Sequence, residues 1–339
     1  MHRITLAHGG GGDLTNELIK KMFFKYFCND LLLQDDDSTI LPVNVEDLSD
    51  KTERLVTTTD SYVITPIFFN GGNIGKLSIY GTVNDLAVSG AKPLYITVGF
   101  IIEEGFAMYK LEKIVESMGE VTAKADVKIV AGDTKVVEKG SCDEIFINTT
   151  GIGVLDKDIY LGGDNAVPGN KVIINGFIGD HGASIMTTRG ELGLSSDLKS
   201  DCRFLHNLTA EILDKCSEVR VLRDPTRGGI ATILNEIASQ SRVGIKLKED
   251  KLPVRNEVKK FCNITGFDPL YLANEGKLVA IVDPKEANQV LDIMKKRYPN
   301  SAIIGEVIEN KKPGVYLETS IGGTRIVNTL RGEMLPRIC

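Results

Sequence analysis

Four aspartates stand at positions from which a folded chain can gather carboxylates around a phosphate group. Asp60 follows an apolar run, Asp133 and Asp224 each follow a predicted strand, and Asn84 and Asp85 lie in a segment whose apolar spacing predicts a helix. Magnesium takes a few carboxylate oxygens from a protein and its other ligands from substrate and water. The pattern therefore predicts a metal–phosphate site. Helix caps, turns or a solvated polar face explain the same residues, so the pattern alone leaves both interpretations open.

A lysine follows one of these aspartates. Lys135 stands two residues after Asp133, where a short apolar strand ends in Gly-Asp-Thr-Lys. A cation beside phosphate-binding carboxylates can neutralise the charge that develops in phosphoryl transfer. An isolated segment of this composition is more often a plain turn, and that interpretation also stays open.

The N-terminal region holds a glycine run and an acidic run. Glycines before a predicted amphipathic helix allow close backbone approach to an anion, although a flexible loop explains them equally well. They match neither the P-loop nor the dinucleotide spacing. The acidic run ends at Asp37 and predicts a solvated turn, with a metal ligand as the alternative. The glycines are Gly9, Gly10, Gly11 and Gly12.

A second glycine run, Gly-x-x-Gly-x-x-Gly at residues 176–182, follows a predicted strand. Its spacing differs from the dinucleotide fingerprint, and no acidic residue ends a strand about 20 residues later. It predicts a tight strand-to-helix turn, with a structural role for His181.

Six cysteines occur, and none forms a Cys-x-x-Cys pair, which argues against zinc and thioredoxin-like sites. Five are explained as small buried hydrophobic residues in a reducing compartment. The sixth, Cys339, is the last residue. A thiol on a mobile arm can reach sites that an internal cysteine cannot, whereas a frayed end with an incidental cysteine is the alternative.

Composition limits the classes of function. At 339 residues two domains are expected, and 42% hydrophobic with 25% charged residues is ordinary for a globular protein. A net charge of −6 provides no basic surface for nucleic acid or an anionic membrane. Neither a membrane-spanning apolar run nor a signal-peptide core is evident. We expect a cytoplasmic protein with no nucleic-acid or membrane partner.

Alternating apolar strands and amphipathic helices predict an α/β (α+β) protein. The first half has predicted strands at 95–103, 127–131 and 145–155 and a helix at 106–125. A segment rich in Gly, Asp, Asn and Pro then marks a domain boundary. The expected units are a glycine-rich loop and helix at 1–34, an N-terminal domain at 35–156, a C-terminal α/β domain at 166–330, and a mobile tail at 331–339.

Taken in order, these segments resemble the HypE family of hydrogenase maturation factors. That family belongs to a superfamily of ATP-using enzymes that includes aminoimidazole ribonucleotide synthetase and selenophosphate synthetase. The resemblance covers essentially the whole chain, and the order of the segments together with the terminal cysteine makes it specific. The segments are 8–12 (HGGGG), 58–63 (TTDSYV), 71–77 (GGNIGKL), 81–85 (GTVND), 132–137 (GDTKVV), 179–182 (GDHG), 223–229 (RDPTRGG), 273–277 (ANEGK) and 336–339 (PRIC).

The resemblance implies a two-domain ATP-binding fold like that of aminoimidazole ribonucleotide synthetase. It implies that N-terminal domains pair in a homodimer, that ATP binds near their junction and that the C-terminal tail is flexible. The family accepts a carbamoyl group on its terminal cysteine from the carbamoyltransferase HypF. It then dehydrates this group with ATP to a thiocyanate, and the cyano group passes through the HypC–HypD complex to the iron of nickel–iron hydrogenase.

This chemistry assigns roles to the matching residues. Removing water from an amide requires its oxygen to become a leaving group, for which phosphorylation by ATP suffices. The step needs Mg²⁺, a cation near the transferred group and a base. We expect Cys339 to carry the carbamoyl group, Lys135 to stabilise developing charge and Glu275 to remove a proton. The expected Mg²⁺ ligands are Asp60, Asp85 and Asp224, with Asp37 as a further candidate. The expected nucleotide-site residues are Gly9, Gly10, Gly11, Gly12, Asp60, Lys76, Asn84, Asp85, Asp133, Thr134 and Asp224. For Lys76, a helix-surface position is the alternative.

Three other functions are weighed against this one. Selenophosphate synthesis uses a Cys or selenocysteine in the N-terminal glycine-rich segment, whereas here the first cysteine is Cys28. Neither that reaction nor purine-pathway synthesis gives Cys339 a purpose. A non-catalytic carrier, in which Cys339 shuttles the cyano group and ATP only sets conformation, is the alternative from a different class. Release of ADP and phosphate distinguishes it from an enzyme.

Overall fold

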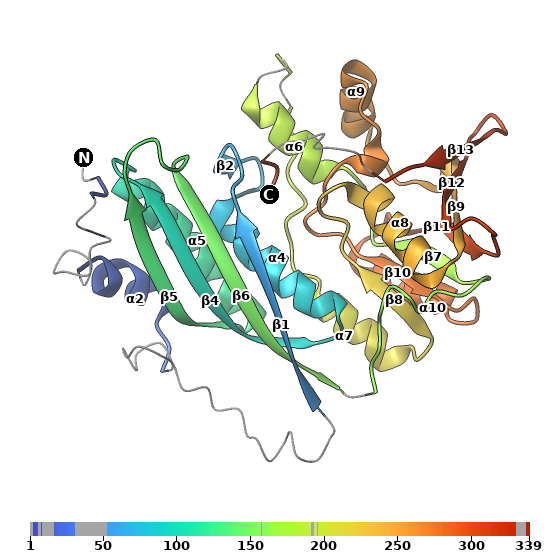
Figure 1. Cartoon of the computed structure of the whole chain (residues 1–339), viewed down its shortest axis with the longest axis horizontal. Helices are drawn as coiled ribbons and strands as arrows, with labels where there is room; N and C mark the ends of the chain where they lie inside the picture. The colour runs from blue at the N-terminus through green and yellow to red at the C-terminus, as the bar shows by residue number, and fades with distance from the viewer. Residues whose placement is uncertain are drawn as a thin grey trace.

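The structure is a computed structural model, and it shows two α/β units side by side (Figure 1). It describes residues 3–5, 8, 17–30, 53–156, 158–190, 193–194, 196–329 and 337–339. The predictions for Gly9 to Gly12 and for Asp37 concern positions outside these described residues. Within the described part of the chain, no helix has both the length and the apolar character needed to cross a membrane.

The N-terminal unit is built on a four-stranded sheet with the order β1-β6-β4-β5. Strands β4 and β5 are parallel, and β6 pairs antiparallel with both β1 and β4. A short hairpin, β2 with β3, precedes the helix that covers the sheet. The strands are β1 (Glu53–Tyr62), β2 (Phe68–Phe69), β3 (Gly72–Asn73), β4 (Lys92–Glu103), β5 (Lys128–Val137) and β6 (Ile145–Asp156).

Two helices, α4 (Ile74–Val88) and α5 (Met108–Ala125), cover one face of this sheet (Figure 1). The Asn73 side chain caps α4 by accepting the N–H groups of Gly75 and Lys76 at 2.9 and 3.0 Å. Twelve of the fifteen residues of α4 are buried. A helix buried on nearly all sides must lie between two layers, and α4 does so between the sheet and α7 of the second unit.

A short N-terminal helical segment closes the end of the first core. It comprises a π-helical turn (Ile19–Phe23) and α2 (Phe24–Phe27), which pack on α5. The first core is the hydrophobic cluster between the first sheet and α4 and α5, with Ile96, Phe100 and Met118 among its members. The ring of Phe23 stacks on that of Phe100 in β4, with centroids 5.1 Å apart. Phe100 therefore lies on the covered face of the sheet.

The opposite face of the first sheet is open. Side chains alternate across a strand, so Thr58, Asp60 and Tyr62 of β1 face α4 while the residues between them face outward. Leu55 is 52% exposed and Ile101 44% exposed on this outer face. No helix of the described part of the chain packs against it (Figure 1).

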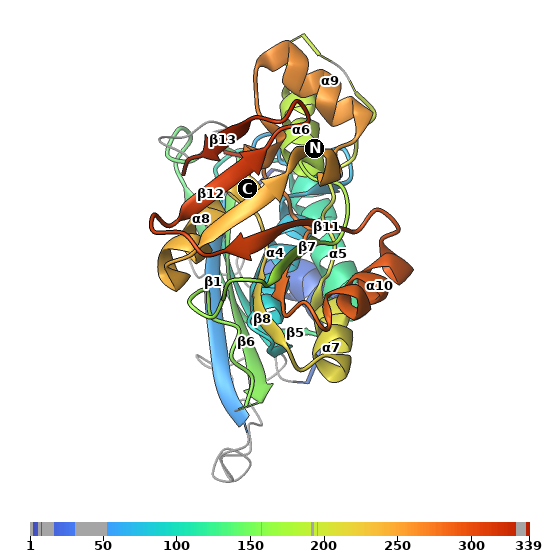
Figure 2. The ribbon, with the colours of Figure 1, turned by 90° about the vertical axis from the view of Figure 1, so that its right-hand side faces the viewer.

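The C-terminal unit is built on a seven-stranded sheet with the order β13-β12-β9-β11-β7-β10-β8, in which only β9 and β12 are parallel neighbours. Figure 2 looks onto β13, β12, β9 and β11 side by side. The strands are β7 (Lys171–Ile174), β8 (Val219–Arg223), β9 (Gly244–Lys248), β10 (Val279–Val282), β11 (Ala302–Ile308), β12 (Gly314–Glu318) and β13 (Thr324–Val327).

Helices cover both faces of the second sheet. One face packs on α8 through residues such as Ile230 and Leu234, and the other packs on α7 and α10 through residues such as Ile212 and Val290. The helices are α6 (Asp180–Arg189), α7 (His206–Lys215), α8 (Gly229–Ser241), α9 (Asn256–Thr265) and α10 (Ala287–Arg297), with 3₁₀ turns at Glu249–Lys251 and Pro269–Tyr271.

The structure confirms the α/β class and most predicted elements. The strand predicted at 95–103 lies within β4, and the helix predicted at 106–125 is α5. Helix α8 begins at Gly229, because Gly228 before it has a left-handed φ of 73° and ends the preceding turn. As predicted, the 176–182 run forms a tight turn into a helix, here α6.

Candidate active site

A small cavity of about 90 Å³ lies where the two units meet, and it gathers most of the predicted catalytic residues. Asp60 and Asp85 reach it from the N-terminal unit, and Asp224 and Glu275 reach it from the C-terminal unit. The terminal Cys339 lines it as well. The full lining is Asp60, Ser61, Tyr62, Gly81, Asp85, Asp224, Thr226, Arg227, Glu275 and Cys339.

The N-terminal wall comes from β1 and α4. Thr58 and Asp60 share the covered face of β1, and the Thr58 hydroxyl donates to the Asp85 carboxylate at 2.8 Å. The Tyr62 hydroxyl donates to Asp60 at 3.2 Å. Tyr62 lies directly over Gly81, where a side chain would overlap its hydroxyl. The helix therefore needs a glycine there to bring Asp85 beside β1.

The C-terminal wall depends on Asn274. Its side-chain amide donates to the carbonyl of Pro225 at 3.0 Å, and its side-chain oxygen accepts the N–H of Gly179 at 2.8 Å. These bonds tie the segment after β8, which carries Asp224, to the segment that carries Glu275. Gly229, with φ +60°, lets the two segments approach, because a Cβ there would lie 2.5 Å from the Leu270 carbonyl.

Glu275 is held by a buried ion pair. Lys277 donates to Asp201 at 2.7 Å, and their side chains are 4% and 0% exposed. The other oxygen of Asp201 accepts the N–H of Glu275 at 3.0 Å. Burial favours a higher pKa for Asp201, yet Lys277 and the hydrogen bonds hold that pKa below its ordinary value. Asp201 is therefore a charged anchor for the Glu275 backbone.

Asn84 joins the two units. Its side chain donates to the carbonyls of Arg203 and Glu275 at 3.0 and 3.3 Å and accepts the N–H of Leu205 at 2.9 Å. It is 1% exposed. The sequence predicts a nucleotide-site role for Asn84, whereas its observed partners are all main-chain groups of the C-terminal unit.

The carboxylates in the cavity repel one another. Burial raises the pKa of Asp85 to about 8, and the charges of Asp224 and Asp60 add to the effect. Burial raises the pKa of Asp224 to about 6, with a contribution from Asp60. Burial, followed by Asp201 and Asp224, raises the pKa of Glu275 well above its usual range. One oxygen of Glu275, Oε1, is buried without a hydrogen-bond partner.

This donor set fits a hard cation such as Mg²⁺. Its oxygens are carboxylates, and the raised pKa values show negative charge that the chain does not compensate. Within the described ranges, however, no three His, Cys, Asp or Glu side chains converge closely enough to hold a metal by themselves. The residues therefore fit an ion that takes its remaining ligands from phosphate and water.

The last three residues are docked beside this cavity. The N–H of Val63 donates to the carbonyl of Cys339 at 3.3 Å, and the N–H of Thr65 donates to that of Arg337 at 3.2 Å. Ile338 is 4% exposed and belongs to the first core. The resemblance implies a flexible tail, and the structure shows a conformation in which Cys339 and Glu275 share one cavity.

Lys135 does not reach this cavity within one chain. It lies on the edge strand β5, in register with Ile101 on the open face. Asp60 on β1 pairs with Thr149 on β6, which pairs with Val98 on β4, which in turn pairs with Gly132 on β5. Three strand spacings, about 14 Å, therefore separate Asp60 from β5. Lys135 and Asp60 are therefore on opposite faces and opposite edges of the sheet.

The other predicted nucleotide-site residues also lie apart. Asp133 and Thr134 line a separate cavity of about 130 Å³ beneath Phe23 and Phe27. Lys76 is on the outer surface of α4, with its ammonium 3.9 Å from Glu120 of α5. This placement matches the helix-surface alternative for Lys76.

Sequence reasoning missed several residues of the site. Asp201 stands alone in a polar segment with no motif around it, so no local signal marks it. Tyr62 and Lys277 fall inside recognised segments but were given no role. Arg54 and Arg223 line a neighbouring cavity of about 260 Å³ that shares Asp85 with the first. Two cations beside Asp85 suit phosphate binding.

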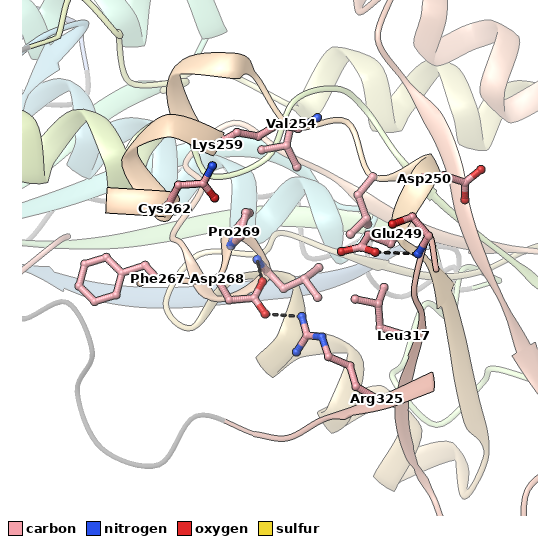
Figure 3. A pocket seen from close by; sticks show the side chains of 14 residues that line it. Glu249, Asp250, Val254, Lys259, Cys262, Phe267, Asp268, Pro269, Leu317 and Arg325 are labelled. Carbon is pink, nitrogen blue, oxygen red and sulfur yellow. Dashed lines mark hydrogen bonds and ion pairs between the residues drawn. The ribbon is translucent and has the colours of Figure 1, made fainter. Parts of the chain in front are cut away.

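A larger cavity, of about 540 Å³, lies in the C-terminal unit (Figure 3). Arg325 and Asp268, which both line it, form an ion pair, and Glu249 accepts the N–H of Ser320. None of the residues predicted to act on phosphate or thiol lines it. The chemistry is concentrated in the smaller cavity.

The raised pKa of Asp85 predicts a pH-dependent stability. Asp85 titrates near 3.8 when unfolded and near 8 in the folded chain, so between these values the folded state holds a proton that the unfolded state has released. Stability therefore falls as pH rises through this window. Without metal or nucleotide, Asp85→Asn should raise the free energy of unfolding at pH 8 by at least about 1 kcal/mol, with little gain at pH 4.

Thermal unfolding at both pH values measures this effect. The matched control is Asp292→Asn on the exposed surface of α10, which should shift neither curve. An Asp85→Asn variant whose stability relative to the native chain is the same at pH 4 and pH 8 would show that neither burial nor the neighbouring carboxylates raise the pKa of Asp85 in solution.

Comparison with known proteins places the chain in a family. Residues 35–155 match the family model of AIR synthase related protein, N-terminal domain, and residues 167–318 match that of the C-terminal domain. The chain is 48% identical to carbamoyl dehydratase HypE of Rhizobium leguminosarum bv. viciae, covering 99% of this chain and 95% of that protein. It is 44% identical to carbamoyl dehydratase HypE of Escherichia coli (strain K12), covering 100% of both.

Solved structures show the same fold. A crystal structure of hydrogenase maturation protein HypE in complex with ATP has a TM-score of 0.93 and 42% identity, covering 99% of both chains. The matching chain in a crystal structure of a HypE–HypF complex has a TM-score of 0.78 and 47% identity, covering 92% of this chain and 99% of that one. The chain therefore belongs to the HypE carbamoyl dehydratase family, among the AIR synthase-related proteins.

Proposed function

We propose that this chain uses ATP to dehydrate an S-carbamoyl group on Cys339 to a thiocyanate, and that it donates the cyano ligand for nickel–iron hydrogenase maturation. One observation carries the proposal: Cys339 lies in the same cavity as Glu275, Asp60, Asp85 and Asp224. The relatives named carbamoyl dehydratase and the related structure with ATP support it.

The reaction balances as follows. The carbamoyl oxygen attacks the γ-phosphorus of ATP, and ADP leaves. One N–H proton is lost, the C–O bond breaks with release of phosphate, and loss of the second N–H proton completes the C≡N bond on sulfur. The group has then lost one water, whose elements appear in the hydrolysis of ATP to ADP and phosphate. The site must accept protons and must bring the carbamoyl oxygen in line with the γ-phosphate.

Glu275 is suited to accept a proton. Its carboxylate is buried, its Oε1 has no partner, and its pKa is raised by burial and by neighbouring carboxylates. Asp60, Asp85 and Asp224 would hold Mg²⁺. The ion would neutralise the negative charge of these carboxylates and of the ATP phosphates. With that repulsion removed, the pKa of Glu275 moves down toward the range of an effective base.

The nucleotide is placed beside Asp85. Arg54 and Arg223 offer guanidinium groups in the adjoining cavity, where they can bind phosphate oxygens. The closing of Gly9 to Gly12 over the phosphates remains a prediction, as does the part of Asp37.

We further propose that the chain forms a homodimer through the open face of its first sheet. An uncovered sheet face with exposed Leu55 and Ile101 favours burial against a second copy. Lys135 lies on that face, on the far edge from its own Cys339. Pairing would let Lys135, and with it Asp133 on the same face of β5, serve the site of the partner chain, whereas Thr134 faces the covered side of the sheet.

The partners follow from the chemistry of Cys339. A carbamoyl donor must reach the thiol, and the HypE–HypF complex supports the carbamoyltransferase HypF in this role. The HypC–HypD complex is proposed as the acceptor from the family resemblance. Both steps need the tail outside the cavity, and the dehydration needs it inside.

Turnover of ATP should depend on the carbamoylated thiol. After carbamoylation by HypF, the chain with Mg·ATP should release ADP and phosphate in step with thiocyanate formation. Cys339→Ala should keep its fold and its ATP binding and release almost no ADP. Coupled ADP and thiocyanate assays measure both. Thiocyanate formed with ATP left intact would favour the non-catalytic carrier.

Glu275→Gln should separate binding from chemistry. The amide keeps the size of the side chain and cannot accept a proton near neutral pH. ATP affinity should therefore change less than about threefold, while the rate of dehydration should fall by roughly 10²-fold or more. Titration calorimetry and single-turnover assays give the two values. Dehydration at the native rate would remove Glu275 as the base.

Mixing two inactive variants tests the dimer. In a hybrid of Lys135→Ala and Cys339→Ala chains, the intact thiol and the intact lysine belong to different chains. If Lys135 serves the partner's site, the mixture regains dehydration that neither variant shows alone. A mixture that exchanges subunits and stays as inactive as its components would place Lys135 outside the partner's site.

A further inference from the structure

The terminal residues contact both units. Residues 337–339 run beside residues 63–65, which continue from β1, with the two N–H···O bonds described above. On the other side of the tail stands α6, from the C-terminal unit (Figure 1). Two side chains of α6 contact the tail backbone.

His181 is the first of these contacts. It is fully buried, and its Nε2 lies 2.7 Å from the carbonyl oxygen of Ile338. A carbonyl only accepts, so Nε2 carries the proton, and in the neutral ring Nδ1 accepts from the Ser200 hydroxyl at 2.8 Å. Burial lowers the pKa of His181, which favours this neutral form. Ser200 thus orients the ring that holds the tail.

Arg189 is the second contact. Its guanidinium donates to the carbonyl of Arg337 at 2.5 Å and to the carbonyl of Thr65 at 2.6 Å. One side chain therefore bridges the tail and the strand beside it. Hydrogen bonds from a charged donor to carbonyls are among the stronger ones in proteins.

The side chains of Arg337 and Ile338 in the tail also make specific contacts. The Arg337 guanidinium donates to the Val63 carbonyl at 2.9 Å, pairs with Asp143 and lies 5.9 Å from the centre of the Phe146 ring. Ile338 is buried in the first core. The surrounding residues thus bind Arg337 by charge and Ile338 by apolar packing, and Cys339 lines the cavity that holds Glu275.

We propose that His181 and Arg189 are positioning residues that seat the reacting tail, and that Asp143 makes the seat specific for Arg337. Without the seat, the carbamoyl group on Cys339 would sample the volume around a free tail. With it, the group is held beside Glu275 as an intramolecular reactant. The inference rests on the proposed function for its purpose, although the seating can be measured without any chemistry.

The test is the rate at which N-ethylmaleimide labels Cys339 in the full-length chain, read on the C-terminal peptide by mass spectrometry. Because a charged hydrogen bond is lost, Arg189→Ala should label about tenfold faster than the native chain. Arg189→Lys should restore much of the protection. The matched control is Arg325→Ala, whose partner Asp268 lies in the C-terminal unit away from the tail, and it should label at the native rate.

A second variant covers the case in which Arg189→Ala does not fold. Arg337→Ala removes the contacts with Val63 and Asp143 from the tail side and should raise labelling of Cys339 in the same way. Circular dichroism and ATP affinity should stay native in every variant compared. Native labelling rates in folded Arg189→Ala, or in Arg337→Ala, would overturn the proposal.

Activity then separates the seat from the reaction. In Arg189→Ala, single-turnover dehydration should slow by about tenfold with unchanged ATP affinity, and Arg189→Lys should recover part of the rate. If labelling changes as expected while even the native carbamoylated chain forms no thiocyanate, the seat stands and the proposed function fails. If labelling is unchanged while the native chain is active, the function stands and the seat fails.

Discussion

The site depends on a buried ion pair that holds the Glu275 segment and on one amide, that of Asn84, which joins this segment to the N-terminal unit. Lys277 and Asp201 are almost completely shielded from water, and such a pair is tolerated only when hydrogen bonds satisfy its remaining groups. Asp201 also accepts the Glu275 N–H, and Asn84 links α4 to the same segment. As a result the helix that carries Asp85 and the loop that carries Glu275 cannot move independently.

This locking allows the fold to hold carboxylates that repel one another. The pKa values of Asp85, Asp224 and Glu275 are all raised, which means that their charged forms lower the stability of the chain without a cation. A local loss of folding stability is common at sites whose residues are arranged to bind a ligand. The largely buried α4 and two hydrophobic cores, each of which takes residues from both units, offset it.

Much of the fold could be predicted from the sequence, because strands such as β4 and helices such as α5 have clear apolar periods. Asp60 near the end of β1, Asp224 after β8 and the helix with Asp85 were also identified, since strand ends and spacing are local features. Glu275 and Cys339 received roles only through the family resemblance. Their common cavity depends on contacts between residues far apart in the chain.

Other features left no local signal. Asp201 pairs with Lys277, which is 76 positions away in the sequence, and Asn84 accepts a hydrogen bond from Leu205, which is 121 positions away. Lys135 is close to Asp133 in the sequence and was therefore grouped with the aspartates. Strand register, however, places it on the open face of the first sheet. Register and order of strands are set by the whole sheet, so sequence spacing cannot reveal them. The docked tail is likewise a matter of tertiary contacts.

The central claim is that Cys339 carries the group that reacts beside Glu275. The most direct measurement is the intact mass of the full-length chain after carbamoylation, before and after addition of Mg·ATP, with the modified residue located by fragmentation. The account predicts that the carbamoylated chain loses the mass of one water and that the change lies on Cys339. A carbamoyl mass that persists on Cys339 while ATP is consumed, or a water lost from another residue, would contradict it.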